Sequence, residues 1–63
     1  MTNENNITLT AIYDNGYKRI VIRFMEDGSI EFSIIGDVTD AEILAAAEAE
    51  GGELPGWSSE ISF

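Results

Sequence analysis

The side chains of this chain that could do chemistry are almost all carboxylates. The sequence holds twelve Asp and Glu residues, three cations and two Tyr, and it contains no Cys and no His. It therefore has no thiolate nucleophile and lacks the commonest general base and metal ligand. Three carboxylates in residues 37–42 offer oxygen ligands to a hard cation, but their spacing is not that of a calcium loop. We expect a protein that is not an enzyme, with no catalytic residues, metal site or cofactor.

The charges are unevenly distributed along the chain. Ten of the twelve carboxylates lie in residues 24–63, a stretch without Lys or Arg. The cations Lys18, Arg19 and Arg23 come just before it, and the net charge is −9. Such a charge opposes compactness and steers the protein toward positively charged surfaces. It also disfavours contact with nucleic acid or an anionic membrane. We expect a basic protein as partner, with no direct binding to nucleic acid or membrane.

The length sets the expected organisation. Residues 1–63 leave room for a single domain with one small core. Residues 1–6 are polar and Asn-rich, and we expect this leader to fray. No apolar run approaches the roughly 20 residues that cross a bilayer, and no signal-peptide pattern opens the chain. The expected compartment is the cytoplasm, which would be that of the host cell if a phage encodes the protein.

The elements that must position the carboxylates begin with three strands. Alternation of apolar and polar residues predicts strands over about 7–14, 17–25 and 29–35. Because short turns join them, they should form an antiparallel meander with the second strand in the centre. In each strand one set of alternate residues is rich in Ile and aromatic side chains, and this set defines the face that is expected to be covered.

The turns predict how these strands pair. A two-residue hairpin loop at 15–16, which is Asn-Gly, pairs Ala11 with Ile20. A three-residue loop at 26–28, with a left-handed Gly at its end, pairs Ile20 with Ile34. A shorter second loop would turn the apolar side chains outward, so the three-residue loop is favoured.

A helix is predicted over about 40–50. Thr39 and Glu42 have the spacing of a capping box, the following residues are good helix formers, and Gly51 suits a left-handed C-cap. The apolar stripe expected to cover the sheet consists of Ile43, Leu44 and Ala47.

Residues 57–63 alternate again and predict a short last strand. If the helix returns across the sheet, this strand runs parallel to the first or third strand, and we favour the edge beside the first. Trp57 either caps one end of the core or anchors an interface. The expected fold class is α+β in the order βββαβ, an antiparallel meander with one helix packed on one face and a short C-terminal strand.

Several of the carboxylates do not serve the fold. Glu48, Glu50 and Glu53 gather where the helix ends, and negative charge is unfavourable there. No Lys or Arg stands one turn away to offset them. A partner-binding role explains them, whereas a solvated face or an adaptation to high salt explains the acids early in the helix equally well. The predicted acidic surface consists of Glu26, Asp27, Asp37, Asp40, Glu42, Glu48, Glu50 and Glu53.

Closely spaced carboxylates can imitate DNA, because those one helical turn apart lie roughly 5–6 Å from each other and phosphates follow about every 3.4 Å of rise per strand. In size, charge, lack of Cys and His, and a sheet with one covering helix, the chain resembles the small acidic DNA-mimic inhibitors of phages and mobile elements, including anti-CRISPR proteins. The resemblance is to a class and includes no motif, and the three cations depart from a pure phosphate mimic. It implies a stoichiometric inhibitor that blocks the DNA-binding site of a host complex, such as a CRISPR surveillance complex or a nuclease.

Two other functions remain open. An immunity or antitoxin protein against a basic nuclease would use the same acids. A small structural or assembly module would instead dimerise through the open face of the sheet, so the expected state is a monomer or a weak homodimer. Arg23 is expected to pair with Glu31 on that face. Its candidate self-association residues are Ile12, Val21, Met25 and Ile35.

Overall fold

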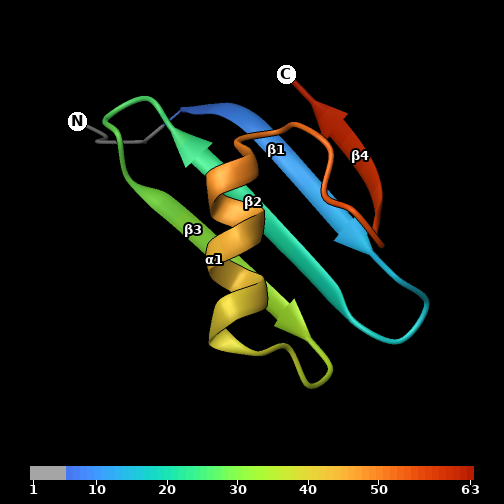
Figure 1. Cartoon of the computed structure of the whole chain (residues 1–63). Helices are drawn as coiled ribbons and strands as arrows, with labels where there is room; N and C mark the ends of the chain where they lie inside the picture. The colour runs from blue at the N-terminus through green and yellow to red at the C-terminus, as the bar shows by residue number, and fades with distance from the viewer. Residues whose placement is uncertain (1–5) are drawn as a thin grey trace.

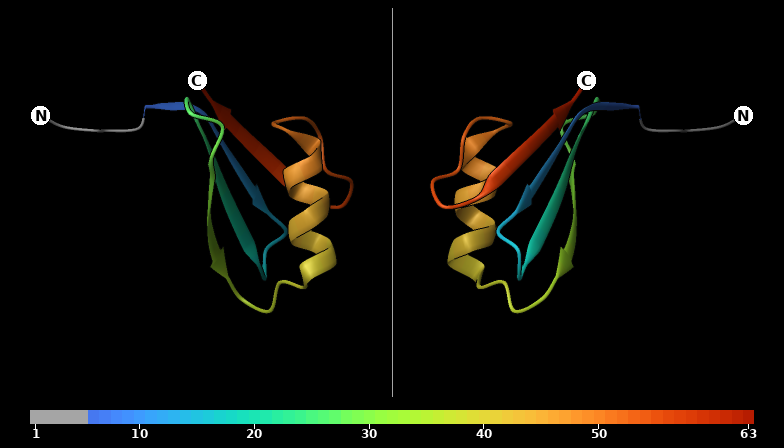
Figure 2. Two further views of the ribbon diagram at one scale, coloured as in Figure 1. Left: turned by 90° about the vertical axis from the view of Figure 1, so that its left-hand side faces the viewer. Right: turned by 90° about the vertical axis from the view of Figure 1, so that its right-hand side faces the viewer.

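The computed structural model describes residues 6–63 and confirms the α+β fold in the order βββαβ. The four strands form one antiparallel sheet in the order β3-β2-β1-β4, and α1 lies across one face of it (Figure 1, Figure 2). We call the face beneath α1 the inner face and the opposite one the outer face. The predicted fraying of residues 1–6 falls almost wholly outside the described residues. The elements are β1 (Ile7–Asp14), β2 (Arg19–Met25), β3 (Ile30–Ile35), α1 (Asp40–Ala49) and β4 (Ser58–Ser62).

The pairing of β2 with β3 is the predicted one. Ile20 lies opposite Ile34, and the connection is the three-residue loop 26–28. Gly28 has a φ of 91°, which supplies the left-handed position that this loop requires. The turn is closed by the N–H of Met25, which donates to the carbonyl of Ser29 at 2.9 Å.

The loop between β1 and β2 is longer than predicted. Ala11 pairs with Ile22, where the sequence predicts Ile20, and the connection consists of residues 15–18. The expected two-residue loop at 15–16 is therefore wrong. Because the register moves by two residues, the side chains from Leu9 to Asp14 keep their predicted face of the sheet. A bulge between Ile7 and Leu9 places Ile7 opposite Met25 and breaks the predicted alternation there.

The side chain of Asn15 explains this longer loop. A two-residue type I′ turn needs a positive φ at both loop residues. Gly16 has a φ of 93°, but Asn15 has a negative one. The Oδ1 atom of Asn15 instead accepts hydrogen bonds from the N–H groups of Tyr17 at 3.0 Å and Lys18 at 2.9 Å. The side chain thus closes a wider turn than the backbone alone would form.

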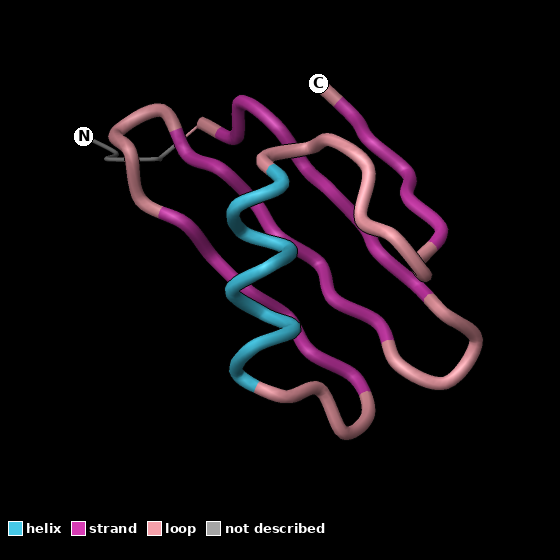
Figure 3. The backbone as a smooth tube through the Cα atoms, in the orientation of Figure 1, coloured by secondary structure: helices cyan, strands magenta, loops and turns pink. Residues whose placement is uncertain are grey.

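The last strand, β4, lies beside β1 as predicted but runs antiparallel to it. The predicted parallel orientation is wrong because of the loop 50–57. This loop follows α1 and runs back along the sheet, so that β4 begins with Ser58 opposite Asp14 (Figure 3). A chain that entered the last strand directly from the helix would have run in the other direction.

The core lies between α1 and the central strands. Its buried residues are Ala11, Tyr13, Ile20, Ile22 and Ala46, and Trp57 packs against them as a partly buried residue at one end. The helix stripe is centred on Ala46, with Ala47 beside it. The prediction that Leu44 belongs to this stripe is wrong, since 59% of Leu44 is exposed. Within residues 6–63 no helix is long and apolar enough to cross a bilayer.

Tyr13 ties the sheet to the loop that follows α1. Its side chain is fully buried, and its hydroxyl donates to the carbonyl of Gly52 at 2.8 Å. We expect Tyr13→Phe to lower the free energy of unfolding by about 1 kcal/mol, because one hydrogen bond is lost without a change of shape. Urea unfolding followed by Trp57 fluorescence measures this, and a stability equal to that of the wild type would show that the bond contributes nothing.

Candidate functional site

At the N-terminal end of α1, Glu42 serves the fold. Thr39 and Glu42 form the predicted capping box, and the Glu42 carboxylate accepts from the N–H of Thr39 at 2.8 Å. The ammonium group of Lys18 contacts the same carboxylate at 3.0 Å. No sequence pattern indicates this ion pair, because it depends on where the β1–β2 loop meets the helix. Glu42 is therefore paired with Lys18 and Thr39 within the protein.

The contribution of the capping box to stability can be tested by its dependence on pH. The hydrogen bond from the N–H of Thr39, followed by the contact with Lys18, lowers the pKa of Glu42 from 4.5. A carboxyl group with a lowered pKa in the folded state stabilises the fold above its unfolded pKa, and this contribution is lost as the pH falls through the folded value. We expect Glu42→Gln to be less stable than the wild type at neutral pH and to show a weaker fall in stability between about pH 5 and about pH 3. If the stabilities of the wild type and Glu42→Gln fall equally as the pH is lowered, the result would contradict this role of Glu42.

Two other carboxylates are held by local contacts. A hydrogen bond from the N–H of Gly16, with a further contribution from Arg19, lowers the pKa of Asp14. Hydrogen bonds from the hydroxyl and N–H of Ser29 lower the pKa of Asp27. Both groups stay ionised at neutral pH, which is the reverse of what a general acid needs. Asp27 remains exposed and charged beside its turn.

At the C-terminal end of α1 the acids have no such partners among the described residues. Glu48 and Glu50 are exposed, and the last turn contains no basic residue. Glu50 is also the C-cap, with φ 49° and ψ 47°, and it is the one described non-Gly residue with a positive φ. A left-handed conformation costs an L-residue roughly 1–2 kcal/mol, and negative charge is unfavourable at this end of a helix. Glu50 thus opposes the fold in two ways.

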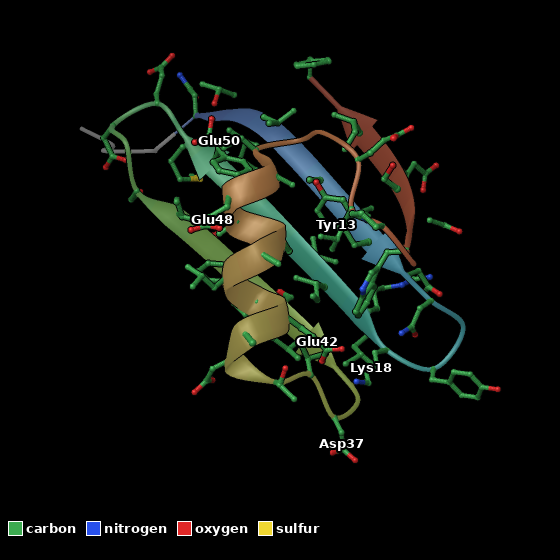
Figure 4. The ribbon with its side chains drawn as sticks, viewed as in Figure 1. Tyr13, Lys18, Asp37, Glu42, Glu48 and Glu50 are labelled. Carbon is green, nitrogen blue, oxygen red and sulfur yellow. The ribbon has the colours of Figure 1, made fainter. Side chains whose placement is uncertain are left out.

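The eight predicted acids form two groups, not one. Figure 4 shows Glu48 and Glu50 at one end of α1 and Asp37 and Glu42 at the other. The loop between β2 and β3 lies at the same end of the molecule as the end of α1 (Figure 1). Along α1 the rise is about 9 Å from Glu42 to Glu48 and about 15 Å from Asp40 to Glu50. The C-terminal acidic group is Glu26, Asp27, Glu48, Glu50 and Glu53, and the N-terminal acidic group is Asp37, Asp40 and Glu42.

The cations of the chain leave most of this charge uncompensated. Among residues 6–63 there are two ion pairs, Lys18 with Glu42 and Arg19 with Asp14. Arg23 lies opposite Glu31, but its Nη1 atom contacts the hydroxyl of Ser33 at 3.4 Å, and the predicted ion pair with Glu31 is absent. All five members of the C-terminal acidic group therefore lack an ion pair within the described chain.

The outer face offers less apolar surface than predicted. Met25 is only 9% exposed, Ile12 and Val21 are half-buried, and 62% of Ile35 is exposed. Two open hollows share the ion pair between Asp14 and Arg19, one of them lined also by Ile35 and the other by Ile12. Because Met25 is buried, the four candidate self-association residues do not all belong to one exposed patch.

The structure instead exposes apolar residues on the inner face, which the sequence assigned to the covered side. Helix α1 packs on β2, and a helix about 10 Å wide cannot cover four strands spaced about 4.8 Å apart. The width of the predicted sheet could have indicated this, but the position of the helix could not be read from the sequence. We call the exposed residues of β3 on this face the apolar shelf, which consists of Ile30 (42% exposed), Phe32 (43%) and Ile34 (38%).

Neither a metal-binding cluster among the described residues nor a match to a known protein identifies the chemistry of this site. Among the residues that the structure describes, no three acidic, His or Cys side chains lie close enough together to hold a metal ion. The described surface presents exposed carboxylates and exposed apolar side chains. No protein-family model matches the sequence, and neither a curated protein nor a solved structure shows significant similarity to it.

Proposed function

We propose that this protein is a stoichiometric, non-enzymatic inhibitor that covers a basic, nucleic-acid-binding surface of another protein and keeps DNA out of it. The observation that carries the proposal is the C-terminal acidic group, which lacks ion pairs within the described chain and includes a left-handed Glu50. Residues that cost a fold stability are typical of functional sites. The carboxylates act together as a field of negative charge, as phosphates do, and no single one is indispensable.

The partner class follows from the chemistry of the surface. A basic channel that binds the phosphates of a duplex also binds closely spaced carboxylates, and such binding weakens as salt is added. A CRISPR surveillance complex or another host nuclease has a channel of this kind. From Asp40 to Glu50 the acids of α1 extend over about 15 Å, which is the rise of four to five base pairs at about 3.4 Å each. They would therefore occupy a short stretch of a DNA path.

Capture from a nuclease-treated bacterial lysate tests this function. The immobilised protein should retain a nucleic-acid-binding protein at low salt and release it when salt or short duplex DNA is added. The matched control is Glu60→Lys, which changes the charge as much as Glu48→Lys does but lies on β4, away from both acidic groups. Glu48→Lys should weaken capture more than Glu60→Lys. Retention that is insensitive to salt, duplex DNA and both variants would contradict the proposal.

A further inference from the structure

Strand β3 is an edge of the sheet with unpaired backbone groups. It pairs with β2 on one side and with no described strand on the other. The N–H of Met25 donates to Ser29, and hydrogen-bonded and non-hydrogen-bonded pairs alternate along an antiparallel ladder. The N–H and C=O groups of Ile30, Phe32 and Ile34 therefore point away from β2. They form a row that another extended chain can pair with.

The same three residues also carry exposed apolar side chains. They form the apolar shelf, and each leaves 38–43% of its surface uncovered. An added strand on β3 would thus gain backbone hydrogen bonds at its edge and apolar contacts on its inner face.

This edge lacks the usual protection against pairing. Natural edge strands carry Lys, Pro or a bulge that keeps other chains away. The sequence of β3, IEFSII, contains neither Lys nor Pro, and its pairing with β2 has a continuous register. The other edge, β4, has the polar sequence SSEIS. The two edges therefore differ, and β3 is the edge that is better suited to pair with another strand.

Charge decides which chain this edge accepts. Every charged side chain from residue 24 to residue 63 is negative, including Glu31 on β3, Glu48 on α1, and the loop acids at both ends of β3. A second copy of this protein would bring another net charge of −9 to the same place. A cationic strand would be attracted by the field that repels this copy.

We infer that β3 receives an extended segment of the basic partner, in which apolar residues alternate with Lys or Arg, as a fifth strand of the sheet. The apolar side chains of this segment lie on the apolar shelf. Its basic side chains lie on the outer face beside Glu31 and reach the loop acids at both ends of β3. This inference rests on the proposed function, because it supplies the docking mode of the same basic partner. Strand addition combines backbone hydrogen bonds with contacts of alternate side chains.

The probe is a capped nine-residue peptide of alternating Val and Lys. In the free protein the amides of Ile30, Phe32 and Ile34 should exchange hydrogen quickly. On addition of the peptide they should become protected, while the amides of Glu31 and Ser33, which already pair with β2, should change little. Nuclear magnetic resonance resolves these amides singly.

Matched variants separate pairing from charge. Phe32→Ser should weaken peptide binding about tenfold, whereas Ile35→Ser, on the outer face of the same strand, should leave it unchanged. The same peptide with N-methylated Val residues keeps its charge but cannot pair, and it should bind weakly. This peptide keeps the test valid if Phe32→Ser fails to fold.

Four results would overturn the inference, and they differ in what they say of the proposed function. In the first result, the two peptides bind equally, or Phe32→Ser and Ile35→Ser bind the peptide equally, while Glu48→Lys weakens peptide binding. Charge alone would then explain the binding, and the proposed function would stand without strand pairing. Protection of the same three amides without peptide, together with a dimer in sedimentation, identifies a second copy as the occupant. Peptide binding that protects no amide of β3 places the docking site elsewhere. Failure of every basic peptide, including nonalysine, to bind at low salt contradicts both proposals.

Discussion

Reversing the charge at the end of α1, by Glu48→Lys with Glu50→Lys, should stabilise the fold and at the same time weaken binding to a basic partner at least tenfold. Each substitution replaces an unfavourable charge at the helix C-terminus by a favourable one, which contributes about 0.3–1 kcal/mol. The same change removes two negative charges from the C-terminal acidic group and adds two positive ones, so that the net charge of the group falls from −5 to −1. Stability and binding should therefore move in opposite directions. Urea unfolding and capture at low salt measure the two effects on the same sample.

A second variant separates the charge of Glu50 from its backbone conformation. Glu50→Gly keeps the left-handed conformation without a side-chain penalty and removes one charge. It should be more stable than the wild type and should weaken capture less than the double reversal does. If the double reversal instead lowers stability, the acids at this end support the fold, and the reason for assigning them to a partner disappears.

Gly36→Ala should be the most destabilising single substitution in the connections between elements. Gly36 has a φ of 90°, and a Cβ atom there would lie 2.9 Å from the carbonyl oxygen of Tyr17 and 3.3 Å from the Cα atom of Lys18. The strain of a left-handed Ala and a clash with backbone add together, and we expect a loss of more than about 2 kcal/mol. For a domain of this size that is a large part of the total stability.

Gly28→Ala is the control for Gly36→Ala. Gly28 has nearly the same φ, 91°, but no atom lies within 4 Å of a Cβ built there. It should therefore show the conformational cost without the clash, and the difference between the two variants measures how tightly the β3–α1 connection packs on the β1–β2 loop. Urea unfolding followed by circular dichroism gives both values. Equal losses would mean that the two loops move apart without cost.

The fold was predictable where side-chain alternation and turn chemistry agree. The loop at 26–28 has one length that keeps Ile20, Ile22 and Phe24 on the inner face, and the structure has that length. The loop at 15–18 was not predictable in the same way. Two registers keep the same faces there, and the hydrogen bonds that the Oδ1 atom of Asn15 accepts from Tyr17 and Lys18 select between them.

The orientation of β4 and the position of α1 depend on packing over long distances. The loop 50–57 is long enough to run back along the sheet, and it is held there by the bond from Tyr13 to Gly52. No local sequence pattern predicts that the loop 50–57 runs back along the sheet. The lateral position of α1 on β2 also depends on packing. The small side chain of Ala46 lets the helix approach β2 closely, and in this position the helix leaves β3 uncovered.

The candidate site was therefore predictable in its charge and not in its shape. Acids that oppose the helix dipole can be recognised in the sequence, and Glu48 and Glu50 are exposed as predicted. The sequence does not reveal that Glu42 is occupied by Lys18, or that the acids divide into two groups with an apolar shelf beside them. These features depend on which elements meet in space.

The measurement that tests the central claim most directly is a competition between this protein and DNA. A captured nucleic-acid-binding protein is purified, loaded with a fluorescent short duplex, and titrated with the wild type or with the Glu48→Lys, Glu50→Lys variant. The account predicts that the wild type displaces the duplex at close to equimolar ratio and that the variant does not. A duplex that stays bound while the wild-type protein binds beside it, or equal displacement by the variant, would contradict the account.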